Sequence, residues 1–258
     1  MTDTKPPVLA SDDPLDRARG YPYDLRGESF ILYEGNVLPA RNYEVHDMKS
    51  RTAVLAIGSN AAPSQLKRKF AETLEDEMIP VYRAVLPDFD AVFSARFSKY
   101  GAIPAALAPS KGTTLEAFVV CLNKAQLRVM HATELASKGG GYHFGRIGGL
   151  RALVDQLGVT ESLHVYHAPG GALEHEGSMI ALADVPAHNR SLPARDHADL
   201  WEEFRAAEAP GESPEAFAAR LSGDAGYRKA QSAVLEARAV QIRLPRYTKL
   251  LPRTRRRR

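Results

Sequence analysis

Two short segments carry residue types that suit chemistry on a small substrate. Gly58-Ser59-Asn60 follows the apolar run 52–57 and precedes a predicted helix. Glycine permits a sharp turn there, and the backbone N–H groups freed at a helix N-terminus can hold an anion such as a carboxylate. Glu134 lies at the end of another predicted helix, and a carboxylate can serve as a general acid or base.

Each segment also has a purely structural interpretation. Ser59 or Asn60 can simply cap the helix that follows, and Glu134 alone is typical of an exposed acid at a helix end. The glycine pattern is not a phosphate loop, because neither the Gly-x-x-x-x-Gly-Lys pattern nor the dinucleotide glycine fingerprint occurs. These residues by themselves leave both interpretations open.

The flanking pattern predicts the elements that position these residues. The run 52–57 is short, apolar and partly β-branched, as in a buried strand, and apolar residues recur at helical spacing from Pro63 to Met78. Asn123 is suited to cap a second helix, which leads to Glu134. Further strands are predicted at 89–97, 101–108, 114–122, 142–147 and 162–168. A turn is predicted at 109–112, between the second and the third of these strands.

The chain divides into three regions by composition. Residues 1–50 carry five prolines and one strand-like run at 29–33, which predicts an extended arm laid over the domain or used in homodimer contacts. Residues 51–185 form the compact domain. Residues 186–258 are rich in Ala, Glu and Arg, with aromatic residues at helical intervals, and predict a mainly helical addition with a last strand at 240–244 and an arginine-rich tail.

The bulk composition excludes several classes of protein. The 258 residues are 44% hydrophobic and 25% charged, which is ordinary for a globular chain. The single cysteine, Cys121, lies in an apolar stretch, so neither an intrachain disulfide nor a thiolate metal cluster can form. No apolar run approaches the roughly 20 residues of a spanning helix, and the N-terminus is polar. We therefore expect a cytoplasmic protein with no membrane contact.

The basic charge is concentrated at the C-terminus. The net charge is +3, but eight Lys or Arg and no acid follow from Arg243 onward, so the rest of the chain carries −5. Arg255, Arg256, Arg257 and Arg258 can attract RNA, DNA or an anionic membrane surface. Since no aromatic residue is interleaved among these arginines, a solvated terminus is the simpler interpretation, and any nucleic-acid contact would be non-specific.

Five blocks between residues 52 and 147 occur in an order that resembles the γ-glutamylcyclotransferases and their relatives. They are Ile57-Gly58-Ser59-Asn60 with Pro63; Val85-Leu86-Pro87-Asp88-Phe89 with Phe93-Ser94; Ile103-Pro104-Ala105 through Gly112 and the strand 116–122; Leu122-Asn123-Lys124-Ala125-Gln126-Leu127 leading to Glu134; and Tyr142. The first 50 and the last 70 residues have no counterpart that we identify in the family. One departure is Ile57, which replaces the tyrosine usual before Gly-Ser-Asn and removes a hydroxyl and a ring from the edge of the site.

The resemblance implies an α+β fold, a γ-glutamylcyclotransferase-like mixed β-barrel with flanking helices, to which the arm and the helical addition are attached. It implies an enzyme that cleaves a γ-glutamyl amide by cyclisation, releasing 5-oxoproline and a free amine without metal or cofactor. In this family a glutamate at the position of Glu134 is catalytic. The residues expected to bind the substrate are Ile57, Gly58, Ser59, Asn60 and Tyr142.

The expected chemistry assigns a role to each group. The substrate's own α-amine attacks its γ-carbonyl carbon, so proximity is already supplied and proton transfer remains. Glu134 can take and return a proton if a partly apolar pocket raises its pKa. The amides of Gly58-Ser59-Asn60 can anchor the α-carboxylate, and Tyr142 can hydrogen-bond the substrate or orient Glu134.

Two other functions stay open from the sequence. One is a non-catalytic binding or assembly protein that keeps the barrel and meets partners through its arm and arginine-rich tail. The other is a different reaction on an amino-acid-like substrate. The sequence does not name the leaving amine.

Overall fold

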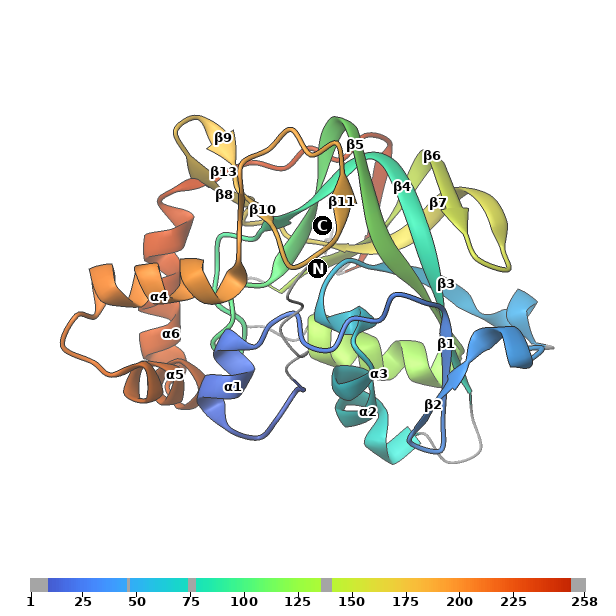
Figure 1. Cartoon of the computed structure of the whole chain (residues 1–258), viewed down its shortest axis with the longest axis horizontal. Coiled ribbons are helices and arrows are strands. Elements are labelled where there is room, and N and C mark those ends of the chain that lie inside the picture. The colour runs from blue at the N-terminus through green and yellow to red at the C-terminus, as the bar shows by residue number, and fades with distance from the viewer. Residues whose placement is uncertain (1–8, 46, 74–77, 136–140, 252–258) are drawn as a thin grey trace, which may run out of the picture.

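A closed barrel of five strands forms the centre of the computed structural model (Figure 1), which describes residues 9–251 except 46, 74–77 and 136–140. The strands are β3 (Thr52–Ala56), β4 (Ile79–Phe93), β5 (Ala105–Leu122), β6 (His143–Val154) and β7 (Gly158–His167). Their order is β5–β3–β7–β6–β4, and β4 pairs with β5 to close the ring. Because β3 and β7 run parallel while the other pairs are antiparallel, this is the mixed barrel of an α+β fold.

Two helices cover one side of the barrel, α2 (Pro63–Phe70) and α3 (Lys124–Glu134). The alternation of side chains along β3 explains this contact. Val54 and Ala56 pack with Leu66 of α2 and Met130 of α3. Leu55, between them in sequence, packs in the other core cluster. The apolar run 52–57 is thus buried on both faces, and the predicted strand-to-helix order is confirmed.

The prediction of a turn at 109–112 between two separate strands is wrong, because β5 continues through these residues. Pro87 of β4 pairs with Thr114, whereas Phe89 pairs with Pro109, so four residues of β5 bulge out opposite Asp88. Gly112 has φ +84° and its N–H donates to Asp88 Oδ1 at 2.8 Å. The proline and glycine therefore mark a wide bulge inside a long strand. Likewise, β4 begins at Ile79, ten residues before the strand predicted at 89–97.

The N-terminal region, predicted as an extended arm, contains regular structure among its described residues. It forms α1 (Pro14–Arg19) and the hairpin of β1 (Phe30–Tyr33) and β2 (Asn36–Pro39). β1 pairs antiparallel with the first residues of β4, so the hairpin extends the central sheet. The strand-like run predicted at 29–33 corresponds to β1.

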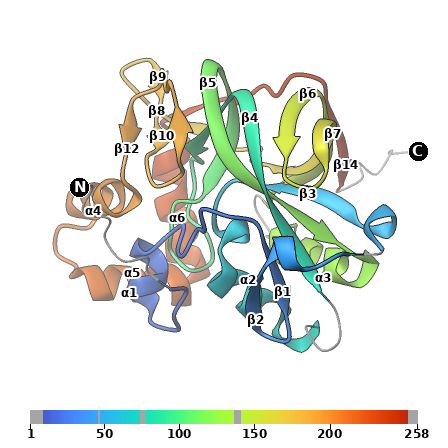
Figure 2. The same ribbon diagram turned by 45° about the vertical axis from the view of Figure 1, so that its right-hand side comes forward.

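The C-terminal region adds a helical cluster beside the barrel (Figure 2), made of α4 (His197–Glu208), α5 (Pro214–Gly223) and α6 (Ala225–Glu236). α1 packs against α4 and α5, so segments from both ends of the chain share this cluster. Trp201 and Phe217 are fully buried, with ring centroids 5.2 Å apart. The remaining short strands are β8 (Ala172–His175), β9 (Ser178–Met179), β10 (Ala181–Leu182), β11 (Ala187–His188), β12 (Ala194–Arg195), β13 (Ala239–Val240) and β14 (Tyr247–Leu251).

The last strand differs from the prediction at 240–244. Of the predicted range 240–244, only Val240 belongs to a strand, β13. The last strand, β14, lies further along the chain and pairs with β6. The arginine-rich tail, residues 252–258, lies outside the described residues.

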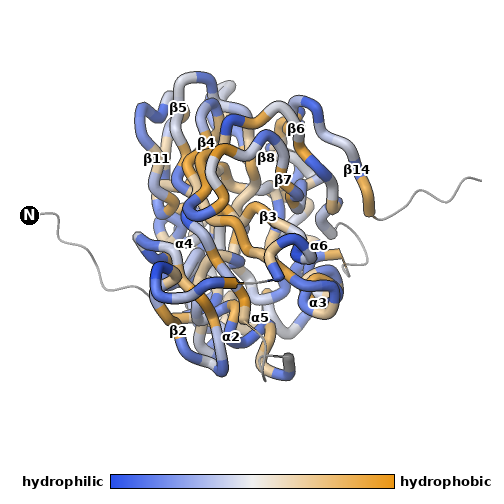
Figure 3. Tube along the Cα trace, turned by 90° about the vertical axis from the view of Figure 1, so that its right-hand side faces the viewer, coloured by the Kyte–Doolittle hydropathy of each residue, from blue (hydrophilic) through white to orange (hydrophobic). Residues whose placement is uncertain are grey.

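The hydrophobic parts of the trace concentrate on strands such as β3 and β4 (Figure 3). Among the described residues, no helix is both long enough and apolar enough to span a bilayer.

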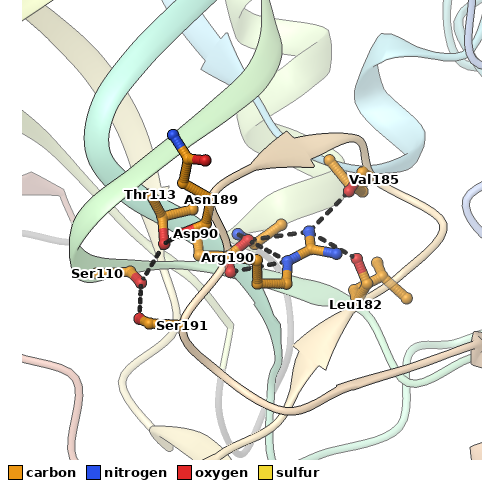
Figure 4. Close-up of polar contacts among 9 residues, drawn as sticks. Asp90, Ser110, Thr113, Leu182, Val185, Asn189, Arg190 and Ser191 are labelled. Carbon is orange, nitrogen blue, oxygen red and sulfur yellow. Dashed lines mark hydrogen bonds and ion pairs between the residues drawn. The ribbon is translucent and has the colours of Figure 1, made fainter.

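A buried ion pair fastens the segment after β10 to the barrel (Figure 4). Asp90 of β4 is fully buried, and Arg190 donates to its two carboxylate oxygens at 2.9 and 3.0 Å. The same guanidinium donates to the Val185 carbonyl at 2.8 Å. In the β5 bulge, the Ser110 hydroxyl lies 2.8 Å from that of Thr113 and 3.2 Å from that of Ser191, so the bulge also holds this segment.

We expect Asp90→Ala to lower the free energy of unfolding by about 3–5 kcal/mol, because it leaves the Arg190 charge buried without its partner. Urea unfolding followed by circular dichroism measures the loss. Arg195→Ala is the control: it breaks the exposed Arg195–Glu203 pair and should cost at most about 1 kcal/mol. Equal effects of the two substitutions would show that the buried pair has no special part in stability.

Candidate functional site

The turn after β3 places Gly58, Ser59 and Asn60 between the barrel and α2. The chain leaves the strand at Ile57, makes one short 3₁₀ turn over Ser59–Ala61 and enters α2 at Pro63. Proline is suited to this first helical position because its nitrogen needs no hydrogen-bond partner there. The turn is closed by the Ala61 N–H, which donates to the Gly58 carbonyl at 2.8 Å.

α3 brings Glu134 to the same place from a distant part of the sequence. Asn123 caps the helix as predicted: its side chain accepts from the Gln126 N–H, and the Gln126 side chain accepts from the Asn123 N–H. This reciprocal capping box fixes where the helix begins. Eleven residues later the helix ends at Glu134, beside the turn that follows β3.

Glu134, Lys69 and Asn60 form a triangle of polar contacts. Lys69 Nζ lies 2.6 Å from Glu134 Oε1 and 2.6 Å from Asn60 Oδ1, and Asn60 Nδ2 donates to Glu134 Oε1 at 3.2 Å. The side chains of Lys69 and Glu134 are only 4% and 14% exposed. Both contacts to the carboxylate reach Oε1, so Oε2 has no hydrogen-bond donor among the described residues.

The ionisation of Glu134 differs from the expectation. Burial alone would raise the pKa of this carboxyl, as the sequence predicted. The Lys69 ammonium and the Asn60 amide outweigh burial, with a smaller contribution from Arg96, and the pKa of Glu134 falls below its usual value. The carboxylate is therefore ionised at neutral pH.

Tyr142 is tied to Glu134 through the backbone. The Tyr142 N–H donates to the Glu134 carbonyl oxygen at 3.1 Å. Its hydroxyl lies 3.5 Å from the Ala105 carbonyl, at the limit of a hydrogen bond, and the Arg96 guanidinium carbon stands 4.2 Å from the ring centroid. Tyr142 thus lies beside Glu134, and the Arg96 guanidinium at its ring adds a cation near the carboxylate.

A second tyrosine, Tyr21, reaches the turn from the N-terminal region. The Ala105 N–H donates to its hydroxyl oxygen at 2.8 Å, and the Ser59 backbone is also hydrogen-bonded to it. A β-carbon at Gly58 would collide with this hydroxyl, so the close approach requires glycine. Burial keeps the pKa of Tyr21 well above its ordinary value. Because the oxygen already accepts from the backbone, its hydrogen is left to be donated into the cavity.

These groups share one cavity of about 920 Å³. The structure brings all six residues predicted from the sequence to its lining: Ile57, Gly58, Ser59, Asn60, Glu134 and Tyr142. One part of the expectation is changed, because the Ser59 backbone, predicted to anchor a carboxylate, is engaged by the Tyr21 hydroxyl. Although Ile57 replaces the tyrosine that the family has at this position, a tyrosine hydroxyl still lies at the site, and it belongs to Tyr21.

The sequence reasoning missed several residues of the site, among them Lys69, Arg96, Tyr21, Tyr100 and Tyr166. Lys69 had a detectable signal: it lies three residues after Leu66 and one before Phe70, on the side of α2 that is otherwise apolar. The other four come from loops or other strands, where no local periodicity points to the site. Burial raises the pKa of Tyr100 to about 12, so this residue also remains a hydrogen-bond donor.

Comparisons with known proteins give no family. No family model matches the sequence, and no curated protein matches it. A solution structure of an Arabidopsis thaliana protein aligns with 13% identity over 46% of this chain and 62% of that one, at a TM-score of 0.32. A crystal structure of an uncharacterized Homo sapiens protein aligns with 16% identity over 78% of this chain and 93% of that one, at a TM-score of 0.35. Likenesses this weak support no conclusion about the function.

We expect Lys69→Met to lower the free energy of unfolding at neutral pH by about 3 kcal/mol, since it leaves a buried carboxylate without its cation. Because the pKa of Glu134 is lower in the folded than in the unfolded protein, its ionised carboxylate stabilises the folded state at pH values above the unfolded-state pKa. This stabilisation is lost as the pH falls through the folded-state pKa of Glu134. Urea unfolding across an acidic pH series should therefore show the difference between wild type and variant narrowing towards low pH.

Lys67→Met on the same helix is the matched control for this substitution. Lys67 is partly exposed and lies outside the cavity lining, so its loss should change stability by no more than about 0.5 kcal/mol at any pH. A Lys69→Met effect that is equally small, or independent of pH, would contradict the assignment of Glu134 as an ionised partner of Lys69.

Proposed function

We propose that this protein is a γ-glutamylcyclotransferase-like enzyme that cleaves a γ-glutamyl amide by cyclisation, releasing 5-oxoproline and a free amine. The position of Glu134 carries the proposal. Its carboxylate lies in a cavity whose size suits a small molecule. Glu134 is 74 residues from Asn60 in the sequence, yet its Oε1 lies 3.2 Å from Asn60 Nδ2. This convergence supports the family resemblance of the turn, the helix and the tyrosine.

The reaction needs only proton transfer from the protein. The α-nitrogen of the γ-glutamyl group forms a bond to the γ-carbonyl carbon, and the bond from that carbon to the leaving nitrogen breaks. Two protons leave the α-ammonium nitrogen, and both end on the leaving nitrogen. Glu134 relays them through its Oε2 and returns to its ionised state, so no water is consumed. Intramolecular attack supplies the proximity of the reacting atoms.

The lowered pKa of Glu134 keeps its carboxylate ionised and ready to accept a proton, but it also makes the carboxylate a weaker base than the raised pKa expected from the sequence would. An ionised carboxylate can accept a proton from the α-ammonium without first losing one of its own. Once protonated, it is a strong acid beside Lys69 and readily gives the proton to the departing nitrogen. Lys69 thus acts in this mechanism as a positioning residue, which holds Oε1 and leaves Oε2 to the substrate.

The α-carboxylate of the substrate needs hydrogen-bond donors or a cation. The amides of the Gly58-Ser59-Asn60 turn are only partly available for this, because the Ser59 backbone is hydrogen-bonded to Tyr21. In the proposed complex Arg96, which lines the cavity beside Tyr142, provides the positive charge. The Tyr21 hydroxyl, fixed by the Ala105 N–H, donates a hydrogen bond. These two groups do the work that the sequence assigned to the backbone of Gly58, Ser59 and Asn60.

Glu134→Gln should lower the rate of 5-oxoproline release by about 10²–10⁴-fold, because the amide cannot relay a proton. The assay incubates the purified protein with γ-glutamyl amines, γ-glutamyl dipeptides and glutathione and quantifies 5-oxoproline by mass spectrometry. Thermal unfolding should show that the variant remains folded.

Glu161→Gln is the control, because Glu161 is exposed on β7 and lies outside this cavity. It should leave the rate unchanged. If folded wild-type protein releases no 5-oxoproline from any of these substrates, the proposal fails and a binding or assembly role, or a different reaction, becomes the better account. Unchanged turnover by Glu134→Gln would reject the catalytic assignment alone.

A further inference from the structure

The cavity that contains Glu134 has a strong excess of positive charge. Nine of the described residues that line it are charged, and seven of these nine are basic. Lys69 is neutralised by Glu134 at 2.6 Å, and Arg68 pairs with Asp12 outside the lining at 2.6 Å. Among the described residues of the lining, the only other acid is Glu236. The positive charge therefore exceeds what the reaction at Glu134 and the binding of one α-carboxylate require.

The excess charge comes from the two ends of the chain and one loop. Arg17 belongs to α1, Lys99 to the loop between β4 and β5, and Arg228 and Lys229 to α6. α6 contributes residues 225, 228, 229, 232, 233 and 236 to the lining, which is the spacing of one helix face. The helical addition thus forms a wall of the cavity, separate from the Lys69–Glu134 pair on α2 and α3.

Three of these cations have no acidic partner among the residues that the structure describes. In the described part of the chain no ion pair joins Arg17, Lys99 or Lys229 to an acid. Arg17 lies 4.9 Å from the Tyr100 ring centroid, and its Nε is buried without a hydrogen-bond partner. Arg228 differs, because it donates to the carbonyls of Leu221 and Ser222 at the end of α5.

Unneutralised charges of one sign that share a cavity repel one another, and an anion bound among them removes that repulsion. A cleft lined by one sign of charge also raises the local concentration of oppositely charged ligands. The volume of about 920 Å³ lies near the upper end of the range of about 300–1,000 Å³ for small-molecule sites. A γ-glutamyl group at Glu134 therefore leaves room for a substantial leaving group.

We propose that the wall formed by Arg17, Lys99 and Lys229 binds the leaving amine, and that this amine carries negative charge as a phosphate or as two or more carboxylates. The inference rests on the proposed cyclotransferase function, which assigns the γ-glutamyl group to Glu134 and the leaving amine to this wall. It adds the substrate class: a γ-glutamyl amide whose far end is anionic.

Matched substrates test the charge directly. γ-Glutamyl-O-phosphoethanolamine and γ-glutamyl-ethanolamine differ only by the phosphate. γ-Glutamyl-aspartate and γ-glutamyl-alanine differ only by the side-chain carboxylate. We expect kcat/KM for 5-oxoproline release to be about tenfold or more higher for the more anionic member of at least one pair, with the preference reduced at high salt. The pair with the larger ratio identifies phosphate or carboxylates as the recognised group. Equal kcat/KM within both pairs would overturn the inference.

The double variant Lys99→Glu, Lys229→Glu tests the residues. It should lower kcat/KM for the anionic member of each pair until the preference over the neutral or less anionic member disappears. The control is Lys111→Glu, Lys124→Glu, which makes the same change in net charge at two exposed lysines outside the lining. It should retain the preference. Equal loss in the two double variants would show that net charge, not this wall, is responsible.

Equilibrium binding separates this inference from the proposed function. Calorimetric titration with O-phosphoethanolamine and with aspartate, which lack a γ-glutamyl group, reports the anionic subsite without any turnover. If no substrate is turned over but a probe binds and the Lys99→Glu, Lys229→Glu variant loses it, the subsite stands and the cyclotransferase proposal fails. If substrates are turned over without charge preference and neither probe binds, the reaction stands and the subsite is rejected.

Discussion

The buried contact between Lys69 and Glu134 is the constraint on which the rest of the site depends. Taking a carboxylate and an ammonium out of water costs several kcal/mol for each ion, and their attraction offsets this only when the geometry is good. Here the distance is 2.6 Å, and Asn60 satisfies both partners. The pair joins α2 to the end of α3, so the distance between the turn after β3 and Glu134 is fixed by charge as well as by packing.

The two terminal regions of the chain line the same cavity as the Lys69–Glu134 pair. Tyr21 brings a hydroxyl against Gly58, and α6 lines another wall with one of its faces. Since α1 packs on α4 and α5, the N-terminal and C-terminal segments support each other beside the barrel. A barrel without them would keep Glu134 and the turn but would lose Tyr21, Arg17 and the side chains of α6. In this protein the regions outside the barrel are part of the site.

The sequence predicted those parts of the site that local signals encode. Gly58 and Pro63 mark a turn into a helix, and Asn123 marks the start of the helix that ends at Glu134. It did not predict Lys69 as a partner, because a lysine in a short helix usually faces solvent. It gave the wrong direction for the pKa of Glu134 for the same reason: burial is visible in the neighbouring apolar residues, whereas the neutralising cation comes from 65 residues away.

The bulge in β5 shows a similar limit of local reasoning. Proline and glycine at 109–112 normally end a strand, but β4 pairs with β5 on both sides of these residues, and that pairing continues the strand across them.

The distribution of charge in the cavity also sets the direction in which a substrate would lie. Lys69 cancels the charge of Glu134, so the Oε2 atom of this pair offers a weakly charged acceptor to an ammonium group. Elsewhere in the lining, Arg17, Lys99 and Lys229 have no acidic partner among the described residues, so they leave an excess of positive charge. A γ-glutamyl amide with an anionic far end has its ammonium group at one end and its extra negative charge at the other. For the proposed substrate, the reverse orientation would place the ammonium among three cations, so this charge distribution would favour the orientation in which the α-amine meets Glu134.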